Sequence, residues 1–119
     1  MASKMVIFCG SDNPEKAFPP FMLGSGALAT DMELMLFFTM SGLNIIKKGG
    51  AEKITMENAP KPLTEFIKVV QELGGRMVAC SAAFPIAEIT SEDLIDGVEI
   101  GGVATFVTEA EEADVVLTF

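Results

Sequence analysis

Arg76-Met-Val-Ala-Cys80-Ser-Ala-Ala-Phe84 is a short apolar run followed by small residues that can begin a helix. The run 76–80 has the composition of a strand buried on both faces of a parallel sheet, and residues 81–87 are predicted to be helical. In parallel α/β proteins, the loops beyond the carboxyl ends of the strands form the functional edge, and helix amino termini face it. The stretch therefore predicts a parallel α/β fold with Cys80 at that edge.

Four further apolar segments predict the remaining strands, at residues 5–9, 33–39, 98–100 and 115–119. Helices are expected from Pro14 onward, over residues 63–73 and over residues 103–113, with a short helical turn at 40–46. Pro19 and Pro20 are expected to kink or restart the first helix, because proline removes a backbone donor and collides with the preceding turn. The alternation of strands and helices predicts parallel pairing through right-handed crossovers. We therefore expect one domain, residues 1–119, with a three-layer α/β/α architecture and a five-stranded, mainly parallel sheet.

The composition excludes several classes of function. Seventeen acidic residues against eight basic ones give a net charge of -9, which repels nucleic acid and anionic membranes and favours basic partners. The sequence contains no histidine, which excludes histidine general bases, Ser/His/Asp triads and imidazole metal sites. The two cysteines lie far apart in the sequence and make a poor zinc site, so we expect no metal and no other cofactor.

The longest apolar candidate for a membrane span covers residues 18–46 and is interrupted by Asp31 and Glu33. We therefore expect no membrane-spanning segment. The amino terminus enters a predicted strand almost at once, without a secretory leader. Together with the low cysteine content, this predicts a cytoplasmic protein with reduced thiols.

The loops that follow the predicted strands are expected to share one crevice at the carboxyl edge of the sheet. Free backbone amides there favour a bound anion, such as a thiolate or a persulfide. The Ser81 hydroxyl and the amides of residues 81–83 are the expected donors. Gly10, Thr39 and Gly101 are expected to shape the crevice. The pair Gly101-Gly102 can either cradle a phosphate or simply allow a tight turn between strand and helix.

Each cysteine allows a functional and a structural interpretation. Cys80 is either a reactive thiol at the edge of the sheet or a small buried apolar residue, because free cysteines are often buried. Cys9 completes an apolar strand, so a structural role is favoured and it remains a secondary candidate. A Cys9–Cys80 disulfide is a further possibility, but it requires α-carbons within about 7 Å, on adjacent strand ends.

Three segments, taken in order, resemble the DsrE/DsrF-like superfamily, in the branch often labelled peroxiredoxin-like. They are Phe37-Phe-Thr-Met-Ser-Gly-Leu43, Leu73-Gly-Gly-Arg-Met-Val-Ala-Cys80 and Glu92-Asp-Leu-Ile-Asp-Gly-Val-Glu-Ile-Gly-Gly-Val-Ala-Thr105, and the resemblance extends over residues 5–119. It implies a three-layer α/β/α fold, homo-oligomers and a role in intracellular sulfur relay. In that family the cysteine matching Cys80 carries sulfur as a persulfide or thiosulfonate and exchanges it with small TusA-like carriers. Related sequences continue after this cysteine with a string such as Gln-Met-Ser-Met, where this chain has Ser81-Ala-Ala-Phe84.

Three hypotheses for the function follow. The first is a cytoplasmic sulfur carrier or sulfurtransferase that relays sulfane sulfur or thiosulfonate through Cys80. The second is an oligomeric module that binds a small anion or a nucleotide at the same edge, with a structural Cys80 and no catalysis. The third is a scaffolding subunit that buries residues 18–28 or the exposed loop 51–62 against a neighbour.

Overall fold

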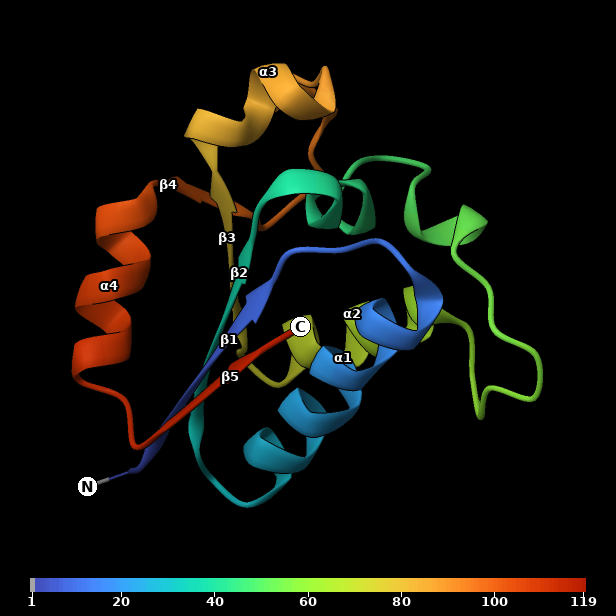
Figure 1. Cartoon of the computed structure of the whole chain (residues 1–119). Coiled ribbons are helices and arrows are strands. Elements are labelled where there is room, and N and C mark those ends of the chain that lie inside the picture. Colours follow the sequence, from blue (N-terminus) through green and yellow to red (C-terminus); the bar gives the residue numbers. More distant parts are fainter. Residues whose placement is uncertain (1) are drawn as a thin grey trace.

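The computed structural model describes residues 2–119 and contains one five-stranded sheet with the strand order β4-β3-β2-β1-β5 (Figure 1). All neighbouring strands pair in parallel, as predicted. The strands are β1 Lys4–Cys9, β2 Glu33–Phe38, β3 Arg76–Cys80, β4 Glu99–Gly101 and β5 Val115–Thr118. Because every strand runs in the same direction, all five carboxyl ends meet at one edge, and this edge holds the predicted site.

Helices cover both faces of the sheet, which confirms the three-layer α/β/α architecture (Figure 1). Helices α1 (Pro14–Ala29) and α2 (Leu63–Glu72) pack on one face, and α4 (Val103–Glu111) packs on the other. The short helix α3 (Phe84–Ala87) lies above the carboxyl edge. Within the described residues there are also four 3₁₀ turns, namely η1 Met40–Ile45, η2 Ala51–Lys53, η3 Ser81–Ala83 and η4 Ser91–Asp93.

Alternation along the strands decides which side chains meet which helix. On β1, Lys4 reaches Glu109 of α4, and the ring of Phe8 lies 5.3 Å from that of Phe106 in the same helix. On β2, Phe38 points to the opposite face, where its ring stacks on that of Phe21 in α1. The strands therefore separate two apolar layers, one under α1 and α2 and one under α4.

Helix α1 continues through Pro19 and Pro20, so the predicted restart of this helix is wrong. The two prolines deprive the carbonyls of Glu15 and Lys16 of their helical partners. Both of these residues are exposed, so water can bond their carbonyls, while Phe18 beside the prolines is fully buried. The free energy gained by burying this side of the helix against the sheet thus exceeds the cost of the two missing hydrogen bonds.

Other differences concern boundaries. The predicted helix over residues 81–87 is divided into the turn η3 and the helix α3. The fourth strand is shifted by one residue and includes Gly101, because this glycine pairs with Cys80 instead of ending the strand before it. The loop 51–62 is only partly exposed, since Ala51 and Ile54 are buried. Within residues 2–119, no helix has the length and apolar character needed to cross a membrane.

Candidate functional site

Cys80 is the last residue of β3 and stands opposite Gly101 of β4 in the register of the sheet. The next residue, Ser81, donates its hydroxyl hydrogen bond across this pair to the carbonyl oxygen of Gly101, over 3.2 Å. The predicted neighbours Ser81 and Gly101 therefore do lie beside Cys80. The Ser81 bond ties the start of η3 to the edge strand.

The side chain of Cys80 is buried, with 2% of the residue exposed. Alternation along β3 places it on the same sheet face as Arg76, whose guanidinium contacts Glu109 of α4. Turn η3 and helix α3 follow directly after it, and α3 packs against η1 at the carboxyl edge. Because the side chain is buried, the structure must open locally before a reagent can reach the sulfur atom.

Cys9 lies in a different environment. It is 1% exposed, and its thiol donates weakly to the carbonyl oxygen of Ile7, over 3.8 Å. Burial raises the pKa of the Cys9 thiol far above its ordinary value, because the apolar surroundings disfavour the thiolate. Burial thus disfavours the thiolate form of Cys9, which is the nucleophilic form of a cysteine.

A disulfide between the two cysteines does not form, and both thiols are free. Strand β2 lies between β1 and β3, which separates their backbones by about 9.5 Å, more than a disulfide spans. The side chains also point to opposite faces, since Cys9 alternates with Phe8 and Cys80 lies on the α4 face. The predicted possibility of adjacent strand ends is therefore wrong.

Of the other predicted residues, Thr39 lies close to Cys80, because Phe38 pairs with Ala79 at the ends of β2 and β3, and Gly10 does not. Thr39 follows β2, is 5% exposed, and donates its N–H to the Cys9 carbonyl over 3.1 Å. Gly10 bonds the carbonyl of Phe119 over 3.0 Å, on the β5 side of β1 and away from β3. The strand order, which the sequence does not reveal, is what separates Gly10 from Cys80.

The Gly101-Gly102 pair allows a close approach of strand and helix. A Cβ atom on Gly101 would lie 2.8 Å from the Thr105 hydroxyl and 2.9 Å from a methyl group of Val78. The N–H of Gly102 already donates to the Thr105 hydroxyl over 3.1 Å, as a cap of α4. Of the two interpretations of this pair, the tight turn is therefore the one that the geometry favours.

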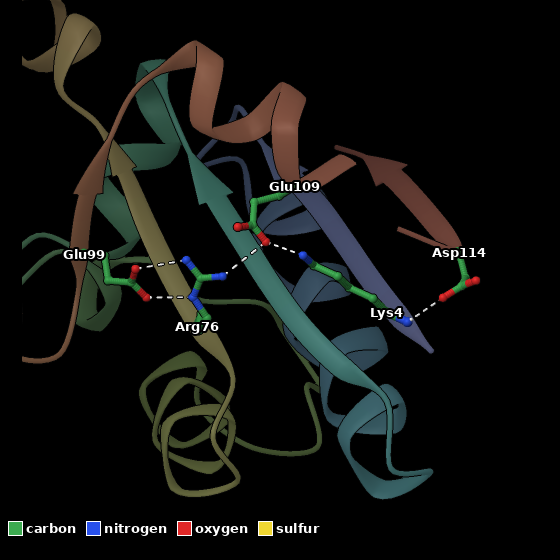
Figure 2. A network of polar contacts seen from close by, with 5 residues as sticks. All are labelled: Lys4, Arg76, Glu99, Glu109 and Asp114. Carbon is green, nitrogen blue, oxygen red and sulfur yellow. Dashed lines mark hydrogen bonds and ion pairs between the residues drawn. The ribbon is translucent and has the colours of Figure 1, made fainter. Parts of the chain in front are cut away.

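A network of charges lies on the α4 face and was not anticipated from the sequence. The carboxylate of Glu109 in α4 accepts hydrogen bonds from Lys4 of β1 and from Arg76 of β3 (Figure 2). The Arg76 guanidinium also donates two hydrogen bonds, of 2.9 and 3.0 Å, to the carboxylate of Glu99 in β4. The backbone N–H of Lys4 donates to Asp114 over 2.8 Å. The network joins α4 to three strands.

These contacts hold the carboxylates in the charged form. The hydrogen bond from Lys4, together with Arg76, keeps the pKa of Glu109 below its ordinary value, and the bond from Arg76 does the same for the pKa of Glu99. Arg76 begins β3 and Cys80 ends it, so the network lies about 13 Å along the strand from the thiol. This distance separates the network from the candidate thiol site.

Three surface hollows, of about 240, 510 and 370 Å³, are lined in part by residues 44–64. Cys80, Ser81 and Gly101 line none of them. Lys47, which the sequence suggested was a helix terminus, lines two of these hollows. Within residues 2–119, acidic and cysteine side chains form no group of three that could hold a metal ion.

Two proteins of known sequence are similar to this chain over most of its length. The uncharacterized protein YrkE of Bacillus subtilis is 25% identical and is matched over 93% of this chain and 92% of its own length. The uncharacterized protein MJ0760 of Methanocaldococcus jannaschii is 26% identical over 89% of this chain, which spans only 38% of that protein.

Two solved structures share the fold. The YchN protein of E. coli has a TM-score of 0.77 at 21% identity, and the protein MTH1491 of Methanobacterium thermoautotrophicum has a TM-score of 0.77 at 15% identity. Each comparison covers 98% of this chain and 99% of the other. The sequence pattern of the DsrE/DsrF-like family matches residues 2–119, which confirms the resemblance found in the three sequence segments. The chain therefore belongs to the DsrE/DsrF-like family.

Proposed function

We propose that the protein is a sulfur carrier or sulfurtransferase whose working group is the thiol of Cys80. The observation that carries this proposal is the position of Cys80 at the carboxyl end of β3, next to the Ser81–Gly101 bond, in a chain of the DsrE/DsrF-like family. Membership of this family supports sulfur relay as a general role. Cys9 is the weaker candidate for the carrier, because burial raises the pKa of its thiol.

The reaction is a pair of thiol exchanges. In the first, the Cys80 thiolate attacks the outer sulfur of a donor persulfide, the donor's S–S bond breaks, and the donor leaves as a thiolate that takes up a proton. In the second, an acceptor thiolate attacks the outer sulfur of the Cys80 persulfide and releases the Cys80 thiolate. Each step exchanges one S–S bond for another, so no metal and no external oxidant is needed.

The neighbours of Cys80 have defined roles in this proposal. The Ser81 hydroxyl turns from the Gly101 carbonyl and donates to the persulfide anion, helped by the amides of residues 81–83. Thr39 lines the same part of the edge from β2. Gly101 allows the close approach of β4, and Gly102 caps α4. Gly10 takes no part, because it lies towards Phe119 and β5.

Because Cys80 is buried, sulfur exchange requires a local opening, and we propose that residues 81–87, which follow Cys80 directly, open as a cover over its side chain. Helix α3 has no fully buried residue of its own, and Ile86 is 65% exposed. A segment with so few buried contacts opens at a much lower free energy than the sheet beneath it. We propose that this opening admits the donor and the acceptor in turn.

The acceptor that suits this edge is a small TusA-like carrier with a basic surface. Every lysine and arginine of the chain lies at or before Arg76, so the charged residues that follow Arg76 are all acidic, for example Glu88 and Glu92. A rim of lysine or arginine on the partner would complement these carboxylates. We further propose that the protein works in the cytoplasm, where thiols are reduced, and as a homo-oligomer.

Mass spectrometry after polysulfide treatment tests the relay. We expect the mass of one added sulfur atom on the peptide containing Cys80, its loss on addition of a small thiol, and the same result for Cys9→Ser. In Cys80→Ser the adduct should disappear. An adduct on Cys9 alone, or none on either peptide, would contradict the proposal.

A second candidate is an anion-binding module in which Cys80 is structural. The 2% exposure of Cys80 favours it. This candidate predicts that Cys80 reacts with alkylating reagents only when the whole domain unfolds, and that Cys80→Ser leaves ligand binding unchanged. The rate of alkylation therefore separates the two functions.

A further inference from the structure

We propose that the protein has a second site, beside the carboxyl ends of β1 and β2, which binds a hydroxylated organic phosphate such as a nucleoside monophosphate. The site is a cavity of about 510 Å³ between residues 12–14, which follow β1, and residues 44–54, which follow β2. Small-molecule sites are commonly about 300–1,000 Å³ in volume. Cys80 does not line this cavity, so the proposal stands independently of the sulfur relay.

Two lysines give the cavity its anion-binding character. Lys47 and Lys53 both line it. The ion pairs formed within residues 2–119 are those of Lys4 and Arg76, which leaves Lys47 and Lys53 without a carboxylate partner. In a chain of net charge -9, two unpaired ammonium groups around one cavity favour a ligand that carries at least one negative charge.

The backbone that carries these lysines is held in place. The carbonyl oxygen of Ile46 accepts a hydrogen bond from the N–H of Ile95 over 2.9 Å, and Lys48 donates its N–H to the carbonyl oxygen of Asp93 over 2.7 Å, so the backbone is held on both sides of Lys47. Gly50 donates to the Lys47 carbonyl over 2.8 Å. The site therefore needs little reorganisation of the main chain on binding, which favours affinity.

Gly50 is required for this arrangement. A Cβ atom there would lie 1.8 Å from the carbonyl oxygen of Asn44, which is possible for no other residue. The buried residues Ala51 and Ile54 anchor the following turn on either side of Lys53. The turn that presents Lys53 is thus attached to the core at both ends.

The amino terminus of α1 borders the cavity but does not supply the binding groups. Pro14 has no N–H, and the amides of Glu15, Lys16 and Ala17 all donate to Asn13. The lysine side chains must therefore bind the anion.

Asp12 and the apolar lining extend the chemistry beyond a bare oxyanion. Asn44 donates to one oxygen of the Asp12 carboxylate over 3.0 Å, and a carboxylate can accept several more hydrogen bonds. Because Asp12 would repel a phosphate placed against it, the ligand must present hydroxyl donors on that side. Pro14 and Ile54 add apolar contact for a ring. A nucleoside monophosphate matches all three features of the cavity. Its phosphate would lie at the lysines, its sugar hydroxyls at Asp12 and its base against the apolar lining.

Titration of the isotope-labelled full chain with four probes, followed by backbone amide NMR shifts, tests this site. The probes are adenosine monophosphate, ribose 5-phosphate, inorganic phosphate and adenosine. We expect the two organic phosphates to shift the amides of Asp12, Gly50 and Lys53 in a saturable manner. Inorganic phosphate and adenosine should bind about tenfold more weakly or worse, because each lacks one of the two recognised groups.

Charge-matched variants separate this cavity from general electrostatics. The double variant K47Q/K53Q should weaken binding of ribose 5-phosphate by about tenfold or more. The control K16Q/K48Q removes the same charge outside the three hollows and should leave the affinity within about a factor of two. D12A should weaken binding of ribose 5-phosphate, because it removes the hydroxyl acceptor, but should not weaken binding of inorganic phosphate, because it also removes a repulsive charge.

Three results would overturn the proposal. They are the absence of saturable shifts with either organic phosphate at millimolar concentration, an equal loss of affinity in the control variant, and equal affinity for inorganic phosphate and ribose 5-phosphate. Unchanged circular dichroism and thermal unfolding of the lysine variants will confirm that lost binding is not lost folding. None of these results depends on sulfur loading of Cys80, so the relay and this site fail or succeed separately.

Discussion

Cys80 and Gly101 face each other at the carboxyl ends of β3 and β4, and the hydroxyl of Ser81 bridges the pair. The carboxyl end of β3, which carries the thiol, is thereby joined to the carboxyl end of the edge strand β4. This junction requires a glycine on β4, since α4 begins two residues later and packs back over the same point. The geometry of the candidate site thus depends on a residue without a side chain.

Gly101→Ala should destabilise the protein by about 1–3 kcal/mol. Its Cβ atom would meet the Thr105 hydroxyl at 2.8 Å and Val78 at 2.9 Å, so α4 or β4 must shift. Urea unfolding measures the change. The matched control is Gly102→Ser, one residue on, where a Cβ atom meets nothing within 4 Å and serine is at least as good a helix cap. Equal destabilisation of both variants would show that packing at Gly101 is not the cause.

The charge network predicts a loss of stability in acid. Glu109 has a pKa below its ordinary value in the folded protein, mainly through the bond from Lys4, and Glu99 has one through Arg76. A carboxylate of this kind contributes its full stabilisation above its unfolded pKa of about 4.3 and loses it as the pH falls through the lower, folded value. We expect the free energy of unfolding to decrease below about pH 5.

Glu109→Gln should lower the stability at neutral pH by about 1–2 kcal/mol and flatten the decline in acid. Glu99 contributes less, because its side chain is 49% exposed and water screens the pair. Glu111→Gln, on the exposed side of the same helix, is the control. If Glu109→Gln retained the full acid dependence of the unmodified protein, the network would not be its source.

Much of the fold could be predicted because each strand is a continuous apolar run and each crossover begins with a recognisable helix signal. The residues 63–73 are an example, since their apolar positions recur at helical spacing and α2 covers nearly the same range. The order of the strands could not be predicted, because it depends on long-range packing that no local pattern encodes. That order decides that Thr39 neighbours Cys80 and that Gly10 does not.

The lysine cavity and the charge network were missed for the same reason. Lys47 had a sufficient local explanation as a helix terminus, and only the fold brings Asp12 and Lys53 to the same cavity. The charge network likewise joins residues from three different elements, since Arg76 lies on β3, Glu99 on β4 and Glu109 on α4. Their pairing follows from the register of β3 and β4 and from the packing of α4.

Exposed valines on one side of α4 predict self-association. Val103 and Val107 lie on one helix face and are 63% and 55% exposed, and Val116 of β5 is 44% exposed. Val116 pairs with Val6, and Val6 lies on the same face of the sheet as Lys4, which contacts α4. Val116 therefore lies on the α4 face of the sheet as well. We expect Val107→Glu to shift the protein to a smaller species in analytical ultracentrifugation, with Thr108→Glu on the same helix as the control. A monomeric unmodified protein would contradict this prediction.

Reactivity of the two thiols should differ in its dependence on urea. If the cover 81–87 opens locally, the alkylation rate of Cys80 in Cys9→Ser will rise only weakly with urea, because local opening exposes little surface. In Cys80→Ser, the rate at Cys9 should rise steeply, since its burial between the sheet and α1 requires global unfolding. Pro85→Gly, which loosens α3 without touching the core, should accelerate labelling of Cys80 by about threefold to tenfold and leave Cys9 unchanged. If Cys80 instead showed the steep urea dependence of Cys9, its sulfur would be reachable only in the unfolded chain. A folded protein could not then use it to exchange sulfur.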